Sequence, residues 1–216
     1  MKIKIDSMIT ISDITKEMEN YIKTELEIKN PELQKKQAMG FYTYNIPRTL
    51  KAYSKKGNDY VIPLGEINNV WNLHPNLEDY ELNFGQHKQI IFPTSNIKLY
   101  DYQSKAVDYM QTQVRGILQS KCGSGKSIMA LELIRRIGYK ALIICEKKEI
   151  QDQFKTYLEN NFGMKQGDYG LIKEGKVEIG NFVTIALRQT LAIIDLTPYK
   201  YEWGVIIVDE CQNVRW

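Results

Sequence analysis

One segment of the chain, residues 120–127, has the composition of a loop that binds phosphates. Gly123 and Gly125 allow the tight turn that points several backbone N–H groups at one anion. A helix is expected to open near Lys126, so that its positive dipole end faces the same anion. Lys126 supplies a point charge for the β- and γ-phosphates, and the Ser127 hydroxyl is suited to bind magnesium. The segment therefore predicts a site for a nucleoside triphosphate with Mg²⁺.

This loop departs from the general phosphate-loop pattern at its first position, where Ser120 stands in place of Gly. A glycine-rich turn that precedes a helix by chance is the alternative interpretation of the loop taken by itself. If the loop binds a nucleotide, the expected contacts are Ser120, Lys121, Cys122, Gly123, Ser124, Gly125, Lys126 and Ser127.

Two adjacent acids follow an apolar stretch further along the chain. Residues 205–208 are all Val or Ile and predict a buried strand, which ends at Asp209 and Glu210. In a parallel sheet, ligands collect at the carboxyl ends of the strands, where the phosphate loop also lies. Asp209 would hold the magnesium through water, and Glu210 would orient or deprotonate the attacking water. Without the loop, the pair would be read as a solvated strand end.

Helical and apolar stretches alternate in the second part of the chain, which predicts a parallel sheet covered by helices on both faces. The expected helices are 102–118, 127–137 and 148–160, and the expected strands are 141–145, 182–186 and 205–208.

The first part of the chain predicts a small α+β domain, residues 1–95, joined at 93–96 to the domain 96–216. A helix from Ser12 to about Ala38 is expected, capped by Ser12 or Asp13 and interrupted at Pro31. The remaining expected elements are strands 41–46, 49–54, 59–63 and 89–93, a turn at 55–58 and a helix at 66–73.

Composition excludes several classes. The N-terminus lacks the apolar core of a signal peptide, and no apolar run is long enough to span a bilayer. The three cysteines have neither disulfide-framework nor zinc-site spacing, which favours reduced thiols in a cytoplasm. A net charge of +3 is too small to identify a polyanionic partner by itself.

Taken in order, these motifs resemble the first motor domain of superfamily 2 DEAD/DEAH-type helicases. Residues 209–212, Asp-Glu-Cys-Gln, are similar to the Asp-Glu-x-His or Asp-Glu-x-Asp box, with Gln212 at the variable last position. That group commonly has Ala at the first loop position, so Ser120 is a smaller departure there. Residues 99–107 resemble the Leu-Arg-x-Tyr-Gln-x-x-Ala-Val segment, which implies that Gln103 reads the adenine edge. A surface helix residue is the alternative interpretation of Gln103.

Two further segments resemble parts that the group places against nucleic acid. Residues 141–154 are similar to a strand, loop and helix that lie on the DNA backbone, so Lys147 and Lys148 are candidate phosphate contacts. A solvated helix start explains either lysine equally well. Residues 183–191 resemble Val-x-Ile-Ala-Thr-x-Gln-Ser-Leu with Leu187 in place of Thr, which leaves Arg188 and Gln189 as candidates.

Residues 28–64 resemble the accessory domain that precedes the motor in phage-type helicases near the XPB and UvsW branch of the superfamily. Between residues 35 and 56 the chain has basic side chains, no acidic ones, and interleaved aromatic rings. These rings either stack on exposed bases or form the core of the small domain. The residues concerned are Lys35, Lys36, Arg48, Lys51, Lys55, Lys56, Phe41, Tyr42, Tyr44 and Tyr53. Of these, Lys51 and Lys55 are singled out as candidate DNA contacts.

Together the motifs predict an ATP-dependent DNA helicase or translocase with ATP and Mg²⁺ as cofactors and Lys126 and Glu210 as catalytic residues. The chain is expected to be an N-terminal fragment, with a second RecA-like domain in the full-length protein. Without the arginine fingers of that domain, turnover would fall by a factor on the order of 10³ or more. The alternative is a module that binds nucleic acid or a partner without significant ATPase activity. A P-loop GTPase fits less well, because the chain has no Asn-Lys-x-Asp segment to read the base, and a P-loop kinase would normally have a lid.

Overall fold

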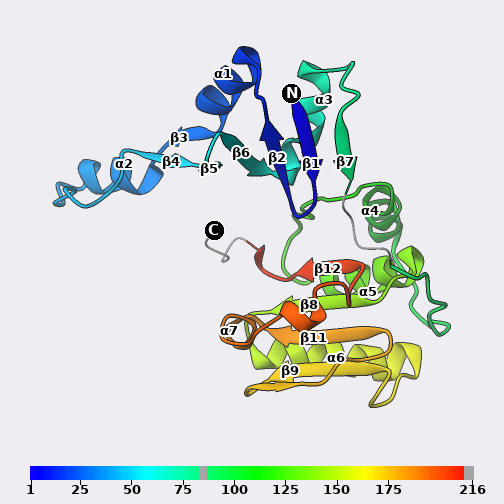
Figure 1. The fold of residues 1–216 in the computed structure, drawn as a ribbon. Coiled ribbons are helices and arrows are strands. Elements are labelled where there is room, and N and C mark those ends of the chain that lie inside the picture. Colours follow the sequence, from blue (N-terminus) through cyan, green and yellow to red (C-terminus); the bar gives the residue numbers. More distant parts are fainter. Residues whose placement is uncertain (83–86, 212–216) are drawn as a thin grey trace. The chain divides into compact units, whose positions relative to one another are not determined.

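The computed structural model describes residues 1–82 and 87–211, and its chain contacts divide it into two compact units (Figure 1). The units are Met1–Phe84 and Gly85–Trp216, and each is described by itself. The sequence placed the boundary about ten residues later, at 93–96. The stretch 90–96 packs within the second unit, because Ile90 N donates to Gly138 O (2.8 Å) and Asn96 N donates to Asn161 O (3.0 Å).

The first unit is built on a five-stranded sheet. In order across the sheet, its strands are β5 (Ser54–Lys56), β6 (Asp59–Pro63), β2 (Met8–Ser12), β1 (Lys2–Ile5) and β7 (Tyr80–Leu82). Apolar residues of β1 and β2 alternate with exposed ones, as a half-buried strand requires. The core is completed by helices α1 (Lys16–Glu25) and α3 (Ile67–Leu73), the latter preceded by a 3₁₀ turn, η1 (Leu64–Glu66).

Helix α1 begins later than the sequence predicted. The Thr15 side chain accepts a hydrogen bond from Met18 N (3.2 Å), so Thr15 is the N-cap. Neither predicted cap is correct: Ser12 ends β2, and Asp13 has a φ of 50°, far from the extended backbone of an N-cap.

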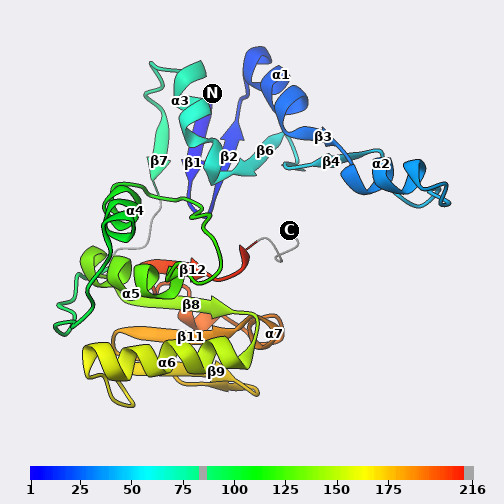
Figure 2. The ribbon, with the colours of Figure 1, turned by 180° about the vertical axis from the view of Figure 1, so that it is seen from behind.

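A second, smaller substructure of this unit is formed by β3 (Glu27–Lys29), β4 (Thr49–Lys51) and the helix α2 (Pro31–Ala38) between them. Figures 1 and 2 show it extending away from the five-stranded sheet of the same unit. We call residues 27–51 the arm. The predicted strand 41–46 is wrong, because this stretch forms turns at the end of the arm. The predicted strand 49–54 is divided between β4 and β5.

The second unit contains a five-stranded sheet in which four neighbouring strands are parallel. Its order is β10 (Lys176–Val177), β9 (Tyr169–Lys173), β11 (Val183–Leu187), β8 (Ala141–Cys145) and β12 (Val205–Val208), with β10 antiparallel to β9. The predicted α/β class with a parallel sheet is confirmed. Strands β8 and β12 have the predicted limits, whereas β9 and β10 were not predicted, and no strand forms at 89–93.

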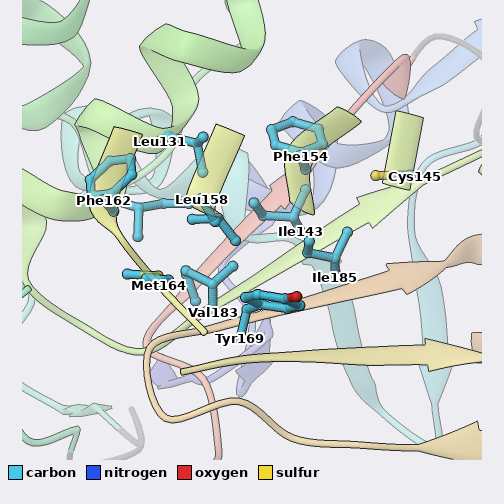
Figure 3. Packing of buried hydrophobic residues seen from close by; sticks show 12 residues of the cluster. Leu131, Ile143, Cys145, Phe154, Leu158, Phe162, Met164, Tyr169, Val183 and Ile185 are labelled. Atoms are coloured by element: carbon cyan, nitrogen blue, oxygen red, sulfur yellow. The ribbon is translucent and has the colours of Figure 1, made fainter. Parts of the chain in front are cut away.

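Long helices cover one face of this sheet and short elements cover the other. Helices α5 (Lys126–Ile137) and α6 (Lys148–Phe162) pack on the first face, with Leu131, Phe154, Leu158 and Phe162 against the strands (Figure 3). The opposite face is covered by α7 (Arg188–Leu191) and the segment around the 3₁₀ turn η2 (Thr197–Tyr199). Helix α4 (Asp101–Gln111) packs on α5 and is shorter than the predicted 102–118.

The predicted burial of residues 205–208 is wrong. Among the described residues, β12 lies at the edge of the sheet beside β8, and its residues alternate between half-buried and exposed. Ile206 is 59% exposed, while Val205 and Ile207 pack against the core. A run of four apolar residues therefore does not distinguish an edge strand from a central one. Within the described residues, no helix is long and apolar enough to cross a membrane.

Candidate nucleotide-binding site

The loop before α5 has the backbone that its glycines permit. Gly123 and Gly125 have φ values of 78° and 81°, in the left-handed region that favours glycine. Gly125 is also the N-cap of α5, so the helix opens at Lys126 as predicted. A Cβ at Gly125 would lie 2.4 Å from Gln103 Nε2, whereas a Cβ at Gly123 would meet nothing within 4 Å. The backbone conformation therefore requires Gly125, and a side chain there would displace the end of the Gln103 side chain.

Gln103 is buried, so it is not the surface helix residue that its position in the sequence also allowed. Its Oε1 accepts from Tyr100 N (2.9 Å) at the start of α4, and its Nε2 donates to Ser124 O (2.9 Å) in the loop. Tyr102 Oη donates to the same carbonyl (3.0 Å), a contact that sequence reasoning missed. Two side chains of α4 thus fix the position of the loop.

Lys126 is bonded to its own loop. Its Nζ donates to the carbonyls of Ser120 and Lys121, both at 3.2 Å, and Ser120 Oγ donates to Ser124 Oγ (2.7 Å). The ammonium group therefore lies against two carbonyls of its own loop.

The two acids lie at the carboxyl end of β12, and they line the same cavity as the loop. Asp209 N donates to Ile144 O (2.9 Å), which continues the pairing of β12 with β8. Glu210 has a φ of 52°, an uncommon conformation for a residue other than glycine. The cavity is about 880 Å³ and its polar lining includes Ser120, Cys122, Lys126, Ser127, Asp209 and Glu210.

The electrostatics of Asp209 suit a cation. Burial raises the pKa of this carboxyl above its ordinary value, and the neighbouring Glu210 charge raises it further, while Lys126 acts in the opposite direction. An added positive charge near Asp209 would therefore stabilise its ionised form. Among the described residues, no group of three or more His, Cys, Asp or Glu side chains could hold a metal alone. Magnesium at phosphate sites takes one or two protein ligands and completes its shell with phosphate and water oxygens, so Ser127 and Asp209 fit that role.

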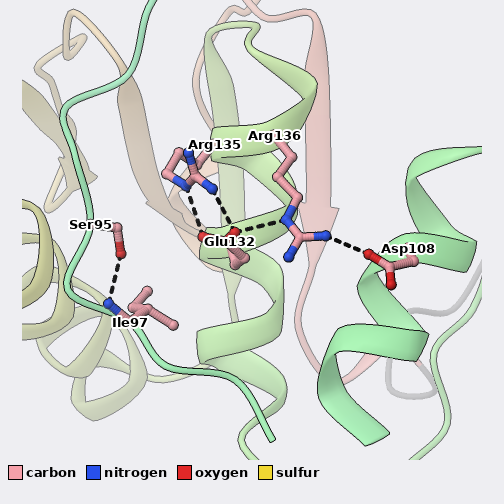
Figure 4. Close-up of polar contacts among 6 residues, drawn as sticks. All are labelled: Ser95, Ile97, Asp108, Glu132, Arg135 and Arg136. Atoms are coloured by element: carbon pink, nitrogen blue, oxygen red, sulfur yellow. Dashed lines mark hydrogen bonds and ion pairs between the residues drawn. The ribbon is translucent and has the colours of Figure 1, made fainter. Parts of the chain in front are cut away.

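An ion cluster around the buried Glu132 joins α5 to the exposed Asp108 of α4, away from the cavity. Figure 4 shows Arg135 and Arg136 converging on Glu132, whose oxygens accept three hydrogen bonds of 2.7–2.8 Å. Arg136 Nη1 also donates to Asp108 on α4 (2.5 Å). Burial opposes ionisation of Glu132, but the hydrogen bonds from the two guanidinium groups outweigh it, so the pKa of Glu132 is lowered. The cluster positions the helix that carries Gln103.

The candidate nucleic-acid contacts of this unit lie at the carboxyl ends of β8 and β11, which are adjacent parallel strands. Lys147 and Gln189 are exposed. Lys148 Nζ lies 3.8 Å from Glu174, and Arg188 Nη2 donates to Glu146 (3.3 Å). Because Lys148 and Arg188 each lie beside an acidic residue, Lys147 and Gln189 are the more accessible of the four candidates.

Lys51 and Lys55 lie in the first unit, where each contacts an aromatic ring. Lys51 Nζ is 5.7 Å from the Tyr53 ring centroid and 3.9 Å from Glu27, and Lys55 Nζ is 4.6 Å from the Tyr60 centroid. Gln212, at the variable position of the acidic box, is outside the described residues.

Comparisons with known proteins agree with these motifs. Residues 96–214 match the family described as the type III restriction enzyme, res subunit. The chain is 31% identical over 121 residues to a protein of Haloarcula marismortui described as the DNA 3'-5' helicase Rad25, a match that covers 55% of this chain and 19% of that protein. It is 25% identical over 174 residues to a protein of Acanthamoeba polyphaga mimivirus described as the ATP-dependent RNA helicase L396, covering 75% and 31% of the two chains.

A solved structure shares the fold. The crystal structure of the UvsW helicase from bacteriophage T4 superposes with a TM-score of 0.65 and 16% sequence identity, covering all of this chain and 84% of the other. The resemblance to superfamily 2 helicases is thereby confirmed at the level of family and fold. The chain spans about a fifth of the length of the first curated relatives that it matches.

Proposed function

Because this chain belongs to the family of the type III restriction enzyme res subunit, a family of helicase-type proteins, we propose that it is the ATP-binding part of an ATP-dependent DNA helicase or translocase. The supporting observation is that Lys126 and Asp209, 83 positions apart in the sequence, line one cavity. A chance glycine-rich turn would have no reason to share a cavity with a half-buried acid at the end of a parallel strand. The cofactors proposed for this cavity are ATP and Mg²⁺.

Different residues of the site would bind the phosphates, hold the magnesium and activate the attacking water. The N–H groups of the loop and the start of α5 receive the phosphate oxygens, and Lys126 exchanges the carbonyls of Ser120 and Lys121 for them. Ser127 and Asp209 hold the magnesium, which when bound neutralises the charge that develops on the phosphates. Glu210 orients the attacking water and accepts its proton.

Nucleic acid is proposed to lie at the edge formed by Lys147, Lys148, Arg188 and Gln189, with further contacts from Lys51 and Lys55 in the first unit. One relative is described as acting on DNA and another as an RNA helicase, and the match to the DNA helicase has the higher identity. We therefore propose DNA as the partner. A second RecA-like domain is proposed to complete the motor, and the first unit is proposed as its accessory domain.

The test is Lys126→Ala, with affinity for a fluorescent ATP analogue measured in the presence of Mg²⁺. We expect affinity to fall at least about tenfold, because the main cationic contact with the phosphates is lost. Lys165→Ala, an exposed lysine outside the cavity lining, is the matched control and should bind normally. Equal binding by the two variants would remove the basis of the proposal.

The same assay separates this proposal from other P-loop classes. Competition by unlabelled ATP and GTP measures the preference for the base, and tight binding of GTP alone would favour a GTPase. The remaining alternative is a binding module without significant ATPase activity. It predicts that Lys126→Ala leaves every measurable activity of the protein unchanged.

A further inference from the structure

The arm contains a helix that does not contribute to a core. Helix α2 has eight residues, and none of them is buried. Helices of this length are marginal in water unless packing or capping supports them. Support comes from the buried Asn30, whose Oδ1 accepts from Glu32 N (3.0 Å) and whose Nδ2 donates to Pro47 O (2.9 Å). The base of the arm is therefore fixed, and its end is free to meet a partner.

Three aromatic residues at the end of the arm are exposed. Tyr42 and Tyr44 are 84% and 85% exposed, and Phe41 is 63% exposed. The Tyr42 and Tyr44 rings stack on one another, with centroids 6.2 Å apart and an interplanar angle of 26°. The sequence left open whether these rings form a core or face outward, and the structure shows that they face outward. By contrast, Tyr53 and Tyr60 pack on the core of the first unit.

The charge around these rings has one dominant sign. The two acids of the arm, Glu27 and Glu32, lie near Lys51 (3.9 Å) and Lys36 (2.8 Å). The basic residues of the arm outnumber them and are Lys29, Lys35, Lys36, Arg48 and Lys51. A surface that combines exposed rings with excess positive charge is complementary to a partner that combines flat apolar faces with negative charge.

We propose that the end of the arm binds unpaired DNA, with bases stacked on Tyr42 and Tyr44 and phosphates neutralised by the arm's basic side chains. Single-stranded nucleic acid offers both features at once. In a duplex, the faces of the bases are covered by their neighbours, so the rings would find little to stack on. The choice of DNA rests on the proposed function, whereas the stacking rests on the exposed rings.

The experiment measures binding of the whole 216-residue chain to a fluorescein-labelled thymidine oligonucleotide and to a labelled duplex, by anisotropy and without nucleotide. Tyr42→Ala with Tyr44→Ala should weaken single-strand binding about tenfold or more, because stacking on each ring is lost. Duplex binding should change by less than about twofold. Tyr42→Phe with Tyr44→Phe keeps both rings and should bind like the parent chain.

A matched control removes two other exposed rings, with Tyr109→Ala and Tyr201→Ala in the second unit. This pair should leave single-strand binding unchanged. The proposal is overturned if the control loses as much affinity as the arm variant, if single-strand and duplex binding fall equally, or if the oligonucleotide does not bind the parent chain. It is also overturned if a uridine oligonucleotide binds and the thymidine one does not.

The phosphate part of the proposal has its own measurement. Lys35→Ala with Lys36→Ala should lower the slope of log affinity against log salt concentration by about 0.7 for each lost contact. Failure of the nucleotide proposal is distinguishable, because Lys126→Ala should leave oligonucleotide binding intact. Loss of arm binding in that variant would instead show that the two sites are not independent, and would count against the arm as a separate site.

Discussion

The nucleotide loop and the arm present their functional groups on different kinds of support. The loop precedes a helix packed on a parallel sheet, and its lysine and its Ser124 carbonyl are already hydrogen-bonded. The arm buries one polar residue, Asn30, and exposes its rings. A site for a small, highly charged ligand needs donors held in place, since misplacement costs binding energy. A surface for a flexible polymer needs accessible area and charge, which an exposed arm supplies.

Two glutamates in ion pairs of similar geometry, one in each region, should show the largest difference in stability between the two regions. Glu132 and Arg136 on α5, and Glu32 and Lys36 on α2, are both i,i+4 pairs at 2.7 and 2.8 Å. Glu132→Gln should destabilise the protein by about 2–3 kcal/mol, because two guanidinium groups lose a buried partner. Glu32→Gln should cost no more than about 0.5 kcal/mol, because that pair is exposed. Urea unfolding measures both, and equal costs would mean that burial does not separate the two regions.

The two glycines of the loop provide the next comparison. Gly123→Ala should cost about 1 kcal/mol, the cost of a left-handed backbone with a Cβ. Gly125→Ala should cost about 2 kcal/mol and also weaken nucleotide binding, because its Cβ would displace Gln103. Adding Gln103→Ala to Gly125→Ala should recover part of the lost stability. If both glycine variants behave alike, the contact between Gln103 and the loop is not the constraint that the geometry implies.

The predictions made from the sequence also differ in accuracy between the unit that contains the loop and the unit that contains the arm. The limits of β8 and β12 and the start of α5 were correct, because long apolar runs and a glycine-rich turn are strong local signals. Strands β1 and β2 were missed, although Ile3, Ile5, Ile9 and Ile11 alternate with polar residues as a half-buried strand requires. The aromatic alternation at 41–46 was taken for a strand, but those rings are exposed and do not form one face of a packed sheet.

The members of the nucleotide site could be named from sequence, but their contacts could not. The fit of Gln103 beneath Gly125 depends on where α4 lies in space, about twenty residues upstream of the loop. The Glu132 cluster, which sets that position, joins residues of α4 and α5 through side chains that look like ordinary surface charges in the sequence. These contacts therefore depend on where α4 lies in space, which the residue types alone do not give.

Substitution of Asn30, at the base of the arm, should have a smaller effect on stability, and that effect should be confined to the arm. Asn30→Ala removes both the cap of α2 and the bond to Pro47 O, which should cost about 1 kcal/mol. Asn30→Asp keeps an acceptor for Glu32 N but sets a carboxylate oxygen against Pro47 O, so it separates loss of the bond to Pro47 from loss of the cap. Hydrogen exchange of the α2 amides should rise more in the alanine variant, with the core of the first unit unchanged. Exchange that stays slow in both variants would mean that something other than Asn30 holds the arm.

The smallest expected effect is a difference in how a solvent-accessible and a buried carboxylate change the stability of the protein with pH. Hydrogen bonds from Lys23 and Tyr60 lower the pKa of Glu19, whose side chain is 32% exposed, while at Glu132 burial is outweighed by the arginine hydrogen bonds, so its pKa is lowered too. An acid whose pKa is lowered on folding adds stability above its unfolded pKa, and that stability is lost as the pH falls through the folded pKa. Both groups should therefore make the protein less stable in acid.

Salt separates the two contributions. Salt at about 1 M shortens the screening length to about 3 Å, which should remove the contribution of Glu19 to stability and leave most of the contribution of Glu132. Unfolding curves of Glu19→Gln and Glu132→Gln across the acid range, at low and high salt, measure the two parts separately. If high salt removed the Glu132 part as completely as the Glu19 part, the ion cluster behind the nucleotide loop would be as accessible to solvent as the exposed charges of the first unit.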